Sequence, residues 1–314
     1  NWIKNSYGNK LKKIIEIGSN DGTMLQNFSE KGKNCIGFEP SSNVSSIATS
    51  KGINSINEFF NTDSIANIDN FLNNTDIICA ANVICHIPDL ENLFSAVDKC
   101  LNKEGLFIFE EPYLGSMFKK ISYDQIYDEH IYMFSASSVQ KICKLYDMEL
   151  VEVLAQNTHG GSLRYVCGRK NIHNVSKNVY KIIDEEKNLN LDNIQSCYKF
   201  KNDCEKSKKK INEKINFYKN QNKKICGYAA TSKSTTILNY CDIGPEIIDY
   251  ICDTTPEKIN KFSPGKHIPI KSMEYFYKNI PDVAFLFAWN HKKEIFEKEK
   301  EFSKKGQWIA HVDL

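Results

Sequence analysis

Short apolar runs alternate with helix-like segments along most of this chain, and that alternation constrains the fold more than any other feature. The runs in the first part are rich in Ile, Phe or Cys and too short for helices, so they predict strands at residues 13–18, 34–39, 76–81 and 105–110. Helical spacing predicts helices at 23–31, 43–51, 90–102 and 135–146. Two later runs, at 149–154 and 162–167, predict an antiparallel pair joined by a polar turn. The pattern predicts an α/β unit with a mostly parallel sheet.

A second alternation of the same kind begins at residue 224. It predicts strands at 225–229, 247–253, 283–287 and 308–312, with helices at 234–239 and 292–304. Between the two alternations the chain is rich in Lys, Asn and Glu, with apolar residues at helical intervals. We therefore expect an α/β domain at 1–170, a Lys-rich helical linker at 171–223, and a smaller Rossmann-like α/β domain at 224–314.

Composition excludes several classes of function. The 314 residues carry 41 Lys+Arg against 39 Asp+Glu, a net charge of +2, and only two of the cations are arginines. We therefore expect no nucleic-acid partner and no membrane association. No apolar run approaches the ~20 residues of a membrane helix, and the start has no signal-peptide core. Eleven cysteines without a C-x-x-C pair indicate reduced thiols and a cytoplasmic protein. Because the chain starts without Met and soon enters a strand, we expect upstream sequence to be missing.

A glycine-containing loop follows the first predicted strand, and an acidic residue ends the second. Gly18 and Gly22 would let the backbone turn sharply and approach a ligand at the carboxyl end of the sheet. Glu39 lies about 20 residues beyond the loop, where a carboxylate accepts hydrogen bonds from a ribose. The alternative is a tight turn beside a surface carboxylate.

The loop sequence separates two possible adenosine cofactors. It has Asn20 where a dinucleotide fingerprint has its second glycine, and Asp21 where a diphosphate would lie. S-adenosylmethionine has no phosphate and carries a sulfonium and an ammonium group, which suit the carboxylates of Glu16 and Asp21. The sequence therefore favours S-adenosylmethionine over NAD.

Two further polar stretches offer chemistry. After the predicted strand at 76–81, Asn82 and His86 would lie at the rim of the crevice formed by the glycine loop. A lone histidine is, however, more often structural. The stretch 123–134 holds three tyrosines, three carboxylates and a histidine. There His130 suits a base that removes a proton beside a ketone, Glu129 could orient it, and Tyr127 could bond the enolate oxygen. The alternative is a polar loop with aromatic packing.

The turn between the last two strands of the first domain is a further candidate. Its glycines permit close approach, and its side chains offer donors to a hydroxylated or phosphorylated substrate, from Asn157, His159 and Arg164. A simple hairpin turn is the alternative.

Taken in order, the motifs of the chain resemble the deoxysugar C-methyltransferases, which act on nucleotide-linked 4-keto-deoxysugars. The motifs are EIGSNDGTML, GFEPS, ANVICHIPDL, FEEPY, YDQIYDEHIYMFS and NTHGGSLR, and the similarity continues through GYAATSKSTTILNYCDIGPEIIDYICDTTPEKINKFSPGKHIPI. The resemblance implies a class I methyltransferase core between an N-terminal zinc module and a C-terminal Rossmann-like domain. It also implies removal of the proton at C3, beside the C4 ketone, and attack of the enolate on the sulfonium methyl.

The residue patterns and the resemblance together predict three sets of residues. The catalytic set is His130, Tyr127, Glu129 and His86. The set expected to bind S-adenosylmethionine is Glu16, Gly18, Asn20, Asp21, Gly22, Glu39, Pro40, Asn82 and Val83. The set expected to bind the nucleotide sugar is Tyr113, Asn157, His159, Arg164, Tyr228 and Lys233.

This chain departs from the family pattern in two places. The cysteine-rich zinc module is absent, so we expect zinc only in a missing N-terminal module and no metal site here. The loop 229–235 is less rich in Gly and Ala than in many members of the family. An O-methyltransferase, an NAD(P)-dependent oxidoreductase and a non-catalytic binding module are the alternatives, and we expect a monomer or weak homo-oligomer.

Overall fold

A computed structural model describes residues 2–8, 11–28 and 34–314, and contacts divide the chain into two compact units. Unit 1 comprises Asn1–Leu114, Ile131–Asn157 and Gly161–Leu189, and unit 2 comprises Gly115–His130, Thr158–Gly160 and Asn190–Leu314. Unit 1 therefore extends beyond the expected boundary at residue 170, and the expected linker is divided between the units. The grouping of 115–130 with the C-terminal unit was not expected from the sequence.

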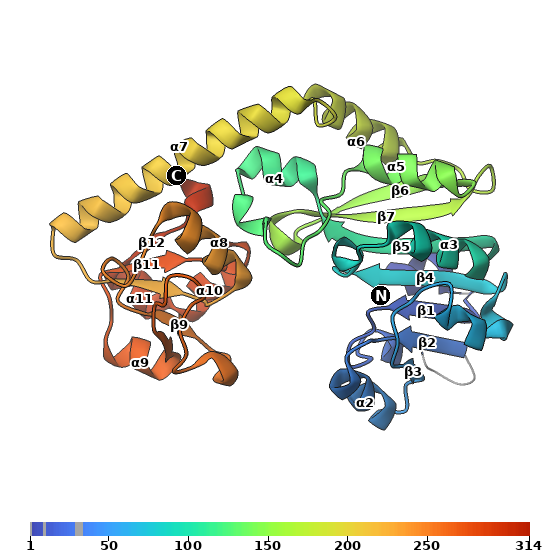
Figure 1. Cartoon of the computed structure of the whole chain (residues 1–314), viewed down its shortest axis with the longest axis horizontal. Helices are drawn as coiled ribbons and strands as arrows, with labels where there is room; N and C mark the ends of the chain where they lie inside the picture. Colours follow the sequence, from blue (N-terminus) through green and yellow to red (C-terminus); the bar gives the residue numbers. More distant parts are fainter. Residues whose placement is uncertain (1, 9–10, 29–33) are drawn as a thin grey trace. The chain divides into compact units, whose positions relative to one another are not determined.

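Unit 1 is built on one seven-stranded sheet (Figure 1). In spatial order its strands are β3 (Ser55–Ile56), β2 (Asn34–Phe38), β1 (Lys13–Ile17), β4 (Thr75–Ala81), β5 (Leu101–Pro112), β7 (Ser162–Arg169) and β6 (Met148–Gln156). The first five are parallel, while β7 is antiparallel to both β5 and β6. This arrangement confirms the predicted α/β unit with a mostly parallel sheet and a terminal antiparallel pair. The two-residue β3 is too short to leave a pattern in the sequence.

Both faces of this sheet are buried, which explains its continuous apolar runs. In β5, Phe107 and Phe109 belong to one core cluster, and Leu106 and Ile108 belong to another. Because side chains alternate along a strand, the two clusters mark its opposite faces. The helices of this unit are α1 (Trp2–Tyr7), α2 (Ser42–Ser50), α3 (Leu90–Cys100), α5 (Ala136–Leu145) and α6 (Lys177–Asn188).

The segment after β1 differs from the expected helix at 23–31. Its described part forms only one 3-10 turn, η2 (Leu25–Asn27), and residues 29–33 lie outside the described residues. The amide of Asn27 donates to the carbonyl oxygens of Thr23 and Met24 at 3.2 and 3.1 Å. Because these carbonyls would otherwise accept bonds from a continuing helix, the asparagine side chain competes with helix formation here.

Unit 2 contains a second, five-stranded sheet, and all its strands are parallel (Figure 1). In spatial order they are β10 (Ile270–Ser272), β9 (Ile251–Asp253), β8 (Ile225–Tyr228), β11 (Val283–Leu286) and β12 (Gln307–Ile309). Its helices are α4 (Leu114–Lys120, whose first residue is in unit 1), α7 (Ile194–Asn220), α8 (Ser232–Cys241), α9 (Met273–Lys278), α10 (Lys292–Lys298) and α11 (Lys300–Lys305). The smaller α/β domain is therefore confirmed, although the sequence analysis missed β10, α4 and α9.

The helix expected at 292–304 is interrupted at Glu299, which has φ −100° and ψ 40°. The Glu299 side chain is buried and accepts hydrogen bonds from the hydroxyls of Tyr228 and Tyr277 at 2.8 and 2.9 Å. Glu299, which the sequence pattern would place on a solvated helix face, is thus buried in the core. The helix is interrupted at this residue.

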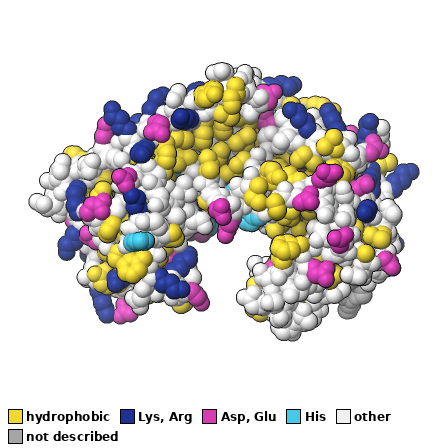
Figure 2. All heavy atoms as spheres, viewed as in Figure 1, with side chains coloured by type: hydrophobic (Ala, Val, Ile, Leu, Met, Phe, Trp, Pro, Cys, Tyr) yellow, Lys and Arg dark blue, Asp and Glu magenta, His cyan; other side chains and the backbone are white. Residues whose placement is uncertain are grey.

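The charge distribution of the surface and the lengths of the helices relate to two classes of partner, nucleic acids and membranes. On the face that Figure 2 shows, Lys and Arg side chains are interspersed with Asp and Glu, as the small net charge would predict. Within the described ranges, every helix is too short or too polar to serve as a bilayer span.

Candidate active site

The glycine loop after β1 has the left-handed backbone that a sharp turn requires. Gly18 has φ +65°, and a Cβ there would lie 2.8 Å from Cγ2 of Val83. Gly22 has φ +77°, and a Cβ would lie 2.9 Å from Cγ1 of Ile53. Both positions combine a left-handed backbone with close packing, so only glycine fits them without strain.

Glu39 reaches this loop from the end of β2, as its spacing predicted. The residue is 8% exposed, and its carboxylate accepts hydrogen bonds from the backbone N–H groups of Asn20 at 3.0 Å and Ser41 at 2.8 Å. Asn20 has φ +51°, a conformation that asparagine tolerates better than most residues. The acidic side chain is therefore held beside the loop and is not a free surface group.

A hollow of about 540 Å³ lies in unit 1 beside Pro40, the residue after Glu39. Its lining residues are mostly polar and come from the segment after β3, namely Asn57, Glu58, Phe59, Asn61, Asp63, Ser64 and Asn67. The sequence analysis proposed only Pro40 from this region. Phe59 is 68% exposed, but an aromatic residue in an Asn-rich segment gives no distinctive sequence signal.

Three buried acceptor atoms along the neighbouring strand ends have no hydrogen-bond partner among the described residues. They are Oε2 of Glu16 in β1, Oδ1 of Asn82 after β4, and Oε2 of Glu111 in β5. Since β1 pairs with β4 and β4 with β5, all three lie toward the same edge of the sheet. A ligand with N–H donors or a positive charge would satisfy them, whereas a phosphate would not.

The two carboxyl groups in this set have strongly shifted pKa values. Burial, and then the nearby Asp21 carboxylate, raise the pKa of Glu16 to about 8. Burial raises the pKa of Glu111 to about 7, although hydrogen bonds from Cys85, Ile84 and Val83 oppose the shift. Both groups therefore titrate near neutral pH. Glu16 was predicted from the sequence, whereas Glu111 was not.

Asp21 has a different environment from the one its proposed role would require. Its carboxylate lies 2.5 Å from the ammonium of Lys51 and accepts a hydrogen bond from the Thr23 hydroxyl at 2.7 Å. Lys51 and then Thr23 lower its pKa to about 2. Its charge is therefore already paired within the protein.

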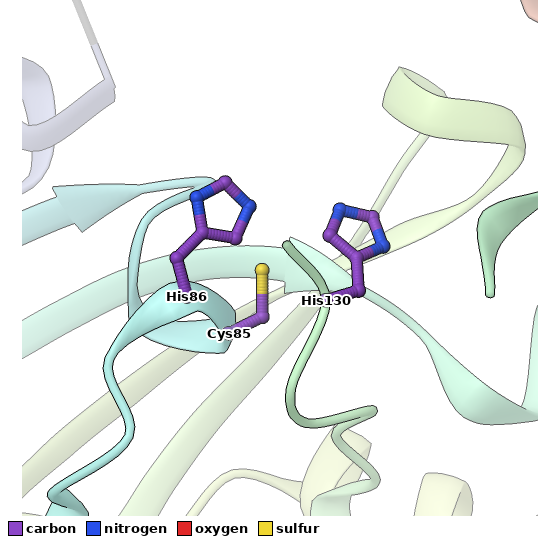
Figure 3. Close-up of side chains that lie close together, drawn as sticks. All are labelled: Cys85, His86 and His130. Carbon is purple, nitrogen blue, oxygen red and sulfur yellow. The ribbon is translucent and has the colours of Figure 1, made fainter. Parts of the chain in front are cut away.

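Glu111 also fixes the turn that follows β4. One of its oxygens accepts from the backbone N–H groups of Val83 at 3.0 Å and Ile84 at 2.7 Å. Ile84 begins the 3-10 turn η5 (Ile84–His86), from which the Cys85 and His86 side chains project in Figure 3. The turn is tied further because the carbonyl of Cys85 accepts from the N–H groups of Ile131 and Tyr132.

In unit 2, the segment before Ile131 holds a tyrosine–histidine pair. The hydroxyl of Tyr127 lies 2.8 Å from Nε2 of His130, and Nδ1 of His130 (drawn in Figure 3) lies 2.8 Å from the carbonyl oxygen of Gln125. A carbonyl can only accept, so Nδ1 carries the proton, and in the neutral ring Nε2 accepts from Tyr127. Glu129 is exposed, and the Gln125 carbonyl takes the orienting position considered for it.

The residues expected to bind substrate differ in their exposure and in their contacts within the protein. In unit 1, Asn157 is exposed, whereas the Arg164 guanidinium is paired with Glu110 at 2.9 Å. Tyr113 is buried, and burial followed by the Glu186 carboxylate raises its pKa.

In unit 2, the hydroxyl of Tyr228 is committed to Glu299. Lys233 is buried, and this burial lowers its pKa. His159 is half-buried with φ +49°. Arg164 and Tyr228 therefore already form polar contacts within the protein.

Comparison with known proteins also divides the chain in two, with a boundary near residue 155 that differs from the boundaries of the two compact units. Residues 4–153 match the family described as a methyltransferase domain, and residues 157–312 match the family described as a C-methyltransferase C-terminal domain. A curated relative, the C-methyltransferase NovU of Streptomyces niveus, is 29% identical over 294 residues, which are 93% of this chain and 70% of the relative. The matched methyltransferase domain confirms the expected fold class of unit 1.

Solved structures show weaker likeness. An O-methyltransferase from a trans-AT PKS multienzyme of Brevibacillus brevis, in complex with S-adenosyl-L-homocysteine, has a TM-score of 0.45 at 10% identity, covering 59% of this chain and 75% of that one. Magnesium protoporphyrin IX methyltransferase from Synechocystis has a TM-score of 0.41 at 14% identity, covering 54% of this chain and 79% of that one.

Proposed function

This chain belongs to the C-methyltransferase family, and from that premise we propose that it methylates C3 of a nucleotide-linked 4-keto-deoxysugar, with S-adenosylmethionine as methyl donor. The observation that carries the proposal is the Tyr127–His130 pair, because its hydrogen bonds leave the histidine in a tautomer able to accept a proton at Nε2. A carbon acid beside a ketone needs such a base, whereas many hydroxyl acceptors do not.

The donor side of the proposal is supported by unit 1. S-adenosylmethionine supplies a methyl group on a cationic sulfur and carries an ammonium group that donates hydrogen bonds. The buried acceptors of Glu16, Asn82 and Glu111 suit these charges, and Glu39 suits the ribose hydroxyls. The hollow beside Pro40 would take the adenine. The loop residues bind and orient S-adenosylmethionine, and Gly18 and Gly22 permit its close approach to the backbone.

The acceptor side of the proposal assigns roles to the segment 115–130. His130 removes the C3 proton, and Gln125 holds the ring so that Nε2 keeps its lone pair. We assign Tyr127 one of two roles. Its hydroxyl turns from Nε2 of His130 to donate a hydrogen bond to the oxygen that becomes negative, or it takes the C3 proton while passing its own proton to His130. His86 remains a further candidate for this group.

The first test is calorimetric titration with S-adenosylhomocysteine, with NADH as the parallel ligand. Binding of S-adenosylhomocysteine alone is expected. Methyl transfer to a panel of TDP-, UDP- and GDP-linked 4-keto-6-deoxyhexoses is then followed by mass spectrometry. Methyl incorporation on oxygen rather than carbon would replace the proposal by an O-methyltransferase, and binding of NADH alone would overturn it.

Replacing Glu39 with alanine is expected to weaken S-adenosylhomocysteine binding. Each charge-assisted hydrogen bond lost is worth roughly 1.5–3 kcal/mol, and the N–H groups of Asn20 and Ser41 also lose their acceptor. The dissociation constant, measured by calorimetry, should rise by at least tenfold. Glu91→Ala, which removes an exposed carboxylate of α3, is the matched control and should leave it unchanged. An unaltered constant in Glu39→Ala would remove Glu39 from the site.

A further inference from the structure

The carboxylate of Asp124 is completely buried in unit 2 and is bonded by two side chains from far along the chain. Its Oδ2 accepts from the indole N–H of Trp289 at 2.7 Å, and its Oδ1 lies 3.1 Å from Nε2 of His311. Trp289 follows β11 and His311 follows β12. Asp124 is therefore held at the carboxyl ends of two neighbouring parallel strands.

The carboxyl edge of an open α/β sheet is its usual ligand-binding edge, and here the chain itself occupies part of it. Asp124 belongs to the 3-10 turn η6 (Tyr123–Gln125). The Tyr123 ring is buried in the core of unit 2 and packs edge-on against His311 at 5.3 Å between centroids. Lys233, in the first turn of α8, is also buried, and the Asp124 charge opposes the lowering of its pKa. The turn is thus held by the hydrogen bonds of Asp124 and by the packing of Tyr123.

The same turn sets the orientation of His130. Gln125 follows Asp124 directly, and its carbonyl oxygen accepts the Nδ1 hydrogen of His130 at 2.8 Å. The Gln125 side chain is buried and donates to the hydroxyl of Ser122 at 2.8 Å. Asp124 and Gln125 are consecutive residues of the same short turn, so the anchoring of Asp124 constrains the position of the Gln125 carbonyl that fixes the histidine tautomer.

Trp289 joins another segment to this anchor. Gly160, in the turn η7 (Thr158–Gly160), lies against the indole so closely that a Cβ would be 2.0 Å from Cη2 of Trp289. Lys120 hydrogen-bonds the carbonyl of Gly160, and its ammonium lies 5.8 Å from the centroid of the indole ring. The indole that donates to Asp124 therefore also packs against Gly160 and lies beside Lys120.

We propose that Asp124 is a positioning residue, through which the C-terminal α/β domain holds the segment 115–130 and fixes the protonated nitrogen of His130. Catalytic importance of this tautomer rests on the proposed function, but the positioning itself does not. A buried carboxylate costs free energy that an apolar side chain would not. Packing alone would not require two donors aimed at one carboxylate.

The test is nitrogen-15 NMR of histidine-labelled protein, which reads tautomers without any substrate. The variant is Asp124→Asn, whose amide oxygen can still accept from Trp289 while its NH₂ group faces His311. His311 is expected to move its proton to Nδ1, which has no partner in the described structure. If Asp124 positions His130, the His130 signals, assigned by their loss in His130→Gln, should shift toward a mixture of tautomers. A His311 change without any His130 change would overturn the proposal.

A second variant keeps the carboxylate and covers the case in which Asp124→Asn fails to fold. Trp289→Phe removes one hydrogen bond to a charged acceptor, so hydrogen exchange at the amides of Ile126 and His130 should rise by roughly ten- to a hundredfold. Trp308→Phe is its control, because the Trp308 indole bonds Ser303 instead. Asp282→Asn is the control for Asp124→Asn. Equal exchange in Trp289→Phe and Trp308→Phe would refute the anchoring role.

Because these measurements need neither methyl donor nor sugar, their outcome is separable from that of the proposed function. A shifted tautomer in a protein without methyl transfer would keep the positioning inference and reject the reaction. Methyl transfer by the wild-type protein, together with an unshifted His130 tautomer in Asp124→Asn, would keep the proposed reaction and reject the positioning inference.

Discussion

Replacing His130 with alanine is expected to slow deuterium incorporation at C3 of the sugar by about 10²–10⁴-fold, the usual contribution of a general base. The measurement is mass spectrometry of the keto sugar that the wild-type enzyme exchanges fastest in heavy water, without methyl donor. Affinity for S-adenosylhomocysteine should not change, because His130 is not among the residues proposed to bind the donor. Exchange at the wild-type rate would mean that another group is the base.

Two further variants make this result specific. Tyr127→Phe removes the hydroxyl that lies 2.8 Å from Nε2 of His130 and leaves the ring. If Tyr127 passes the proton to His130, this variant should be as slow as His130→Ala. If Tyr127 only bonds the substrate oxygen, the loss should be smaller. His267→Asn is the matched control, because His267 is exposed and its left-handed backbone suits asparagine.

Local patterns in the sequence predicted the parts of the fold whose causes are local. The strand ends, the left-handed glycines and the reach of Glu39 all follow from segments of a few residues and from the order of strands. The unexpected helix break at Glu299 has a different cause, since it depends on two tyrosines, of which Tyr228 is 71 residues away. Only the folded core brings these groups together.

The same distinction applies to the candidate site. The sequence predicted that His130 and Tyr127 belong together, because they are only three positions apart in one stretch. It did not predict the Gln125 carbonyl, since a backbone group has no sequence signature. Nor could it pair Asp124 with groups 165 and 187 residues away. The raised pKa values of Glu16 and Glu111 are also consequences of burial, which residue type alone does not specify.

The affinity for S-adenosylhomocysteine is expected to increase as the pH rises from 5.5 to 7.5. The pKa of Glu16 is about 8 without ligand, so its carboxyl group is mostly protonated in this range. If the ligand ammonium binds beside it, the ionised form is favoured, and binding releases a proton. The limiting slope is a tenfold change in dissociation constant per pH unit, and calorimetry in two buffers of different ionisation enthalpy counts the protons.

Glu16→Gln should abolish that slope, because a glutamine cannot release a proton. Glu111→Gln is the companion variant, since Glu111 has a pKa of about 7 and would otherwise contribute to the same range. A slope that survives in Glu16→Gln and vanishes in Glu111→Gln would assign the linkage to Glu111. A flat wild-type profile would place the ammonium away from both carboxyl groups.

The stability of the ligand-free protein gives an independent check of the Glu16 pKa. A carboxyl group whose pKa is raised on folding binds more protons in the folded state than in the unfolded state between pH ~4.5 and ~8. The free energy of unfolding should therefore fall as the pH rises through this window, by up to about 1.4 kcal/mol per pH unit for this one group. In Glu16→Gln that contribution should vanish. Urea unfolding at pH 5.5 and 7.5 measures the difference, and identical pH dependence in the two proteins would show that Glu16 is already ionised before the ligand arrives.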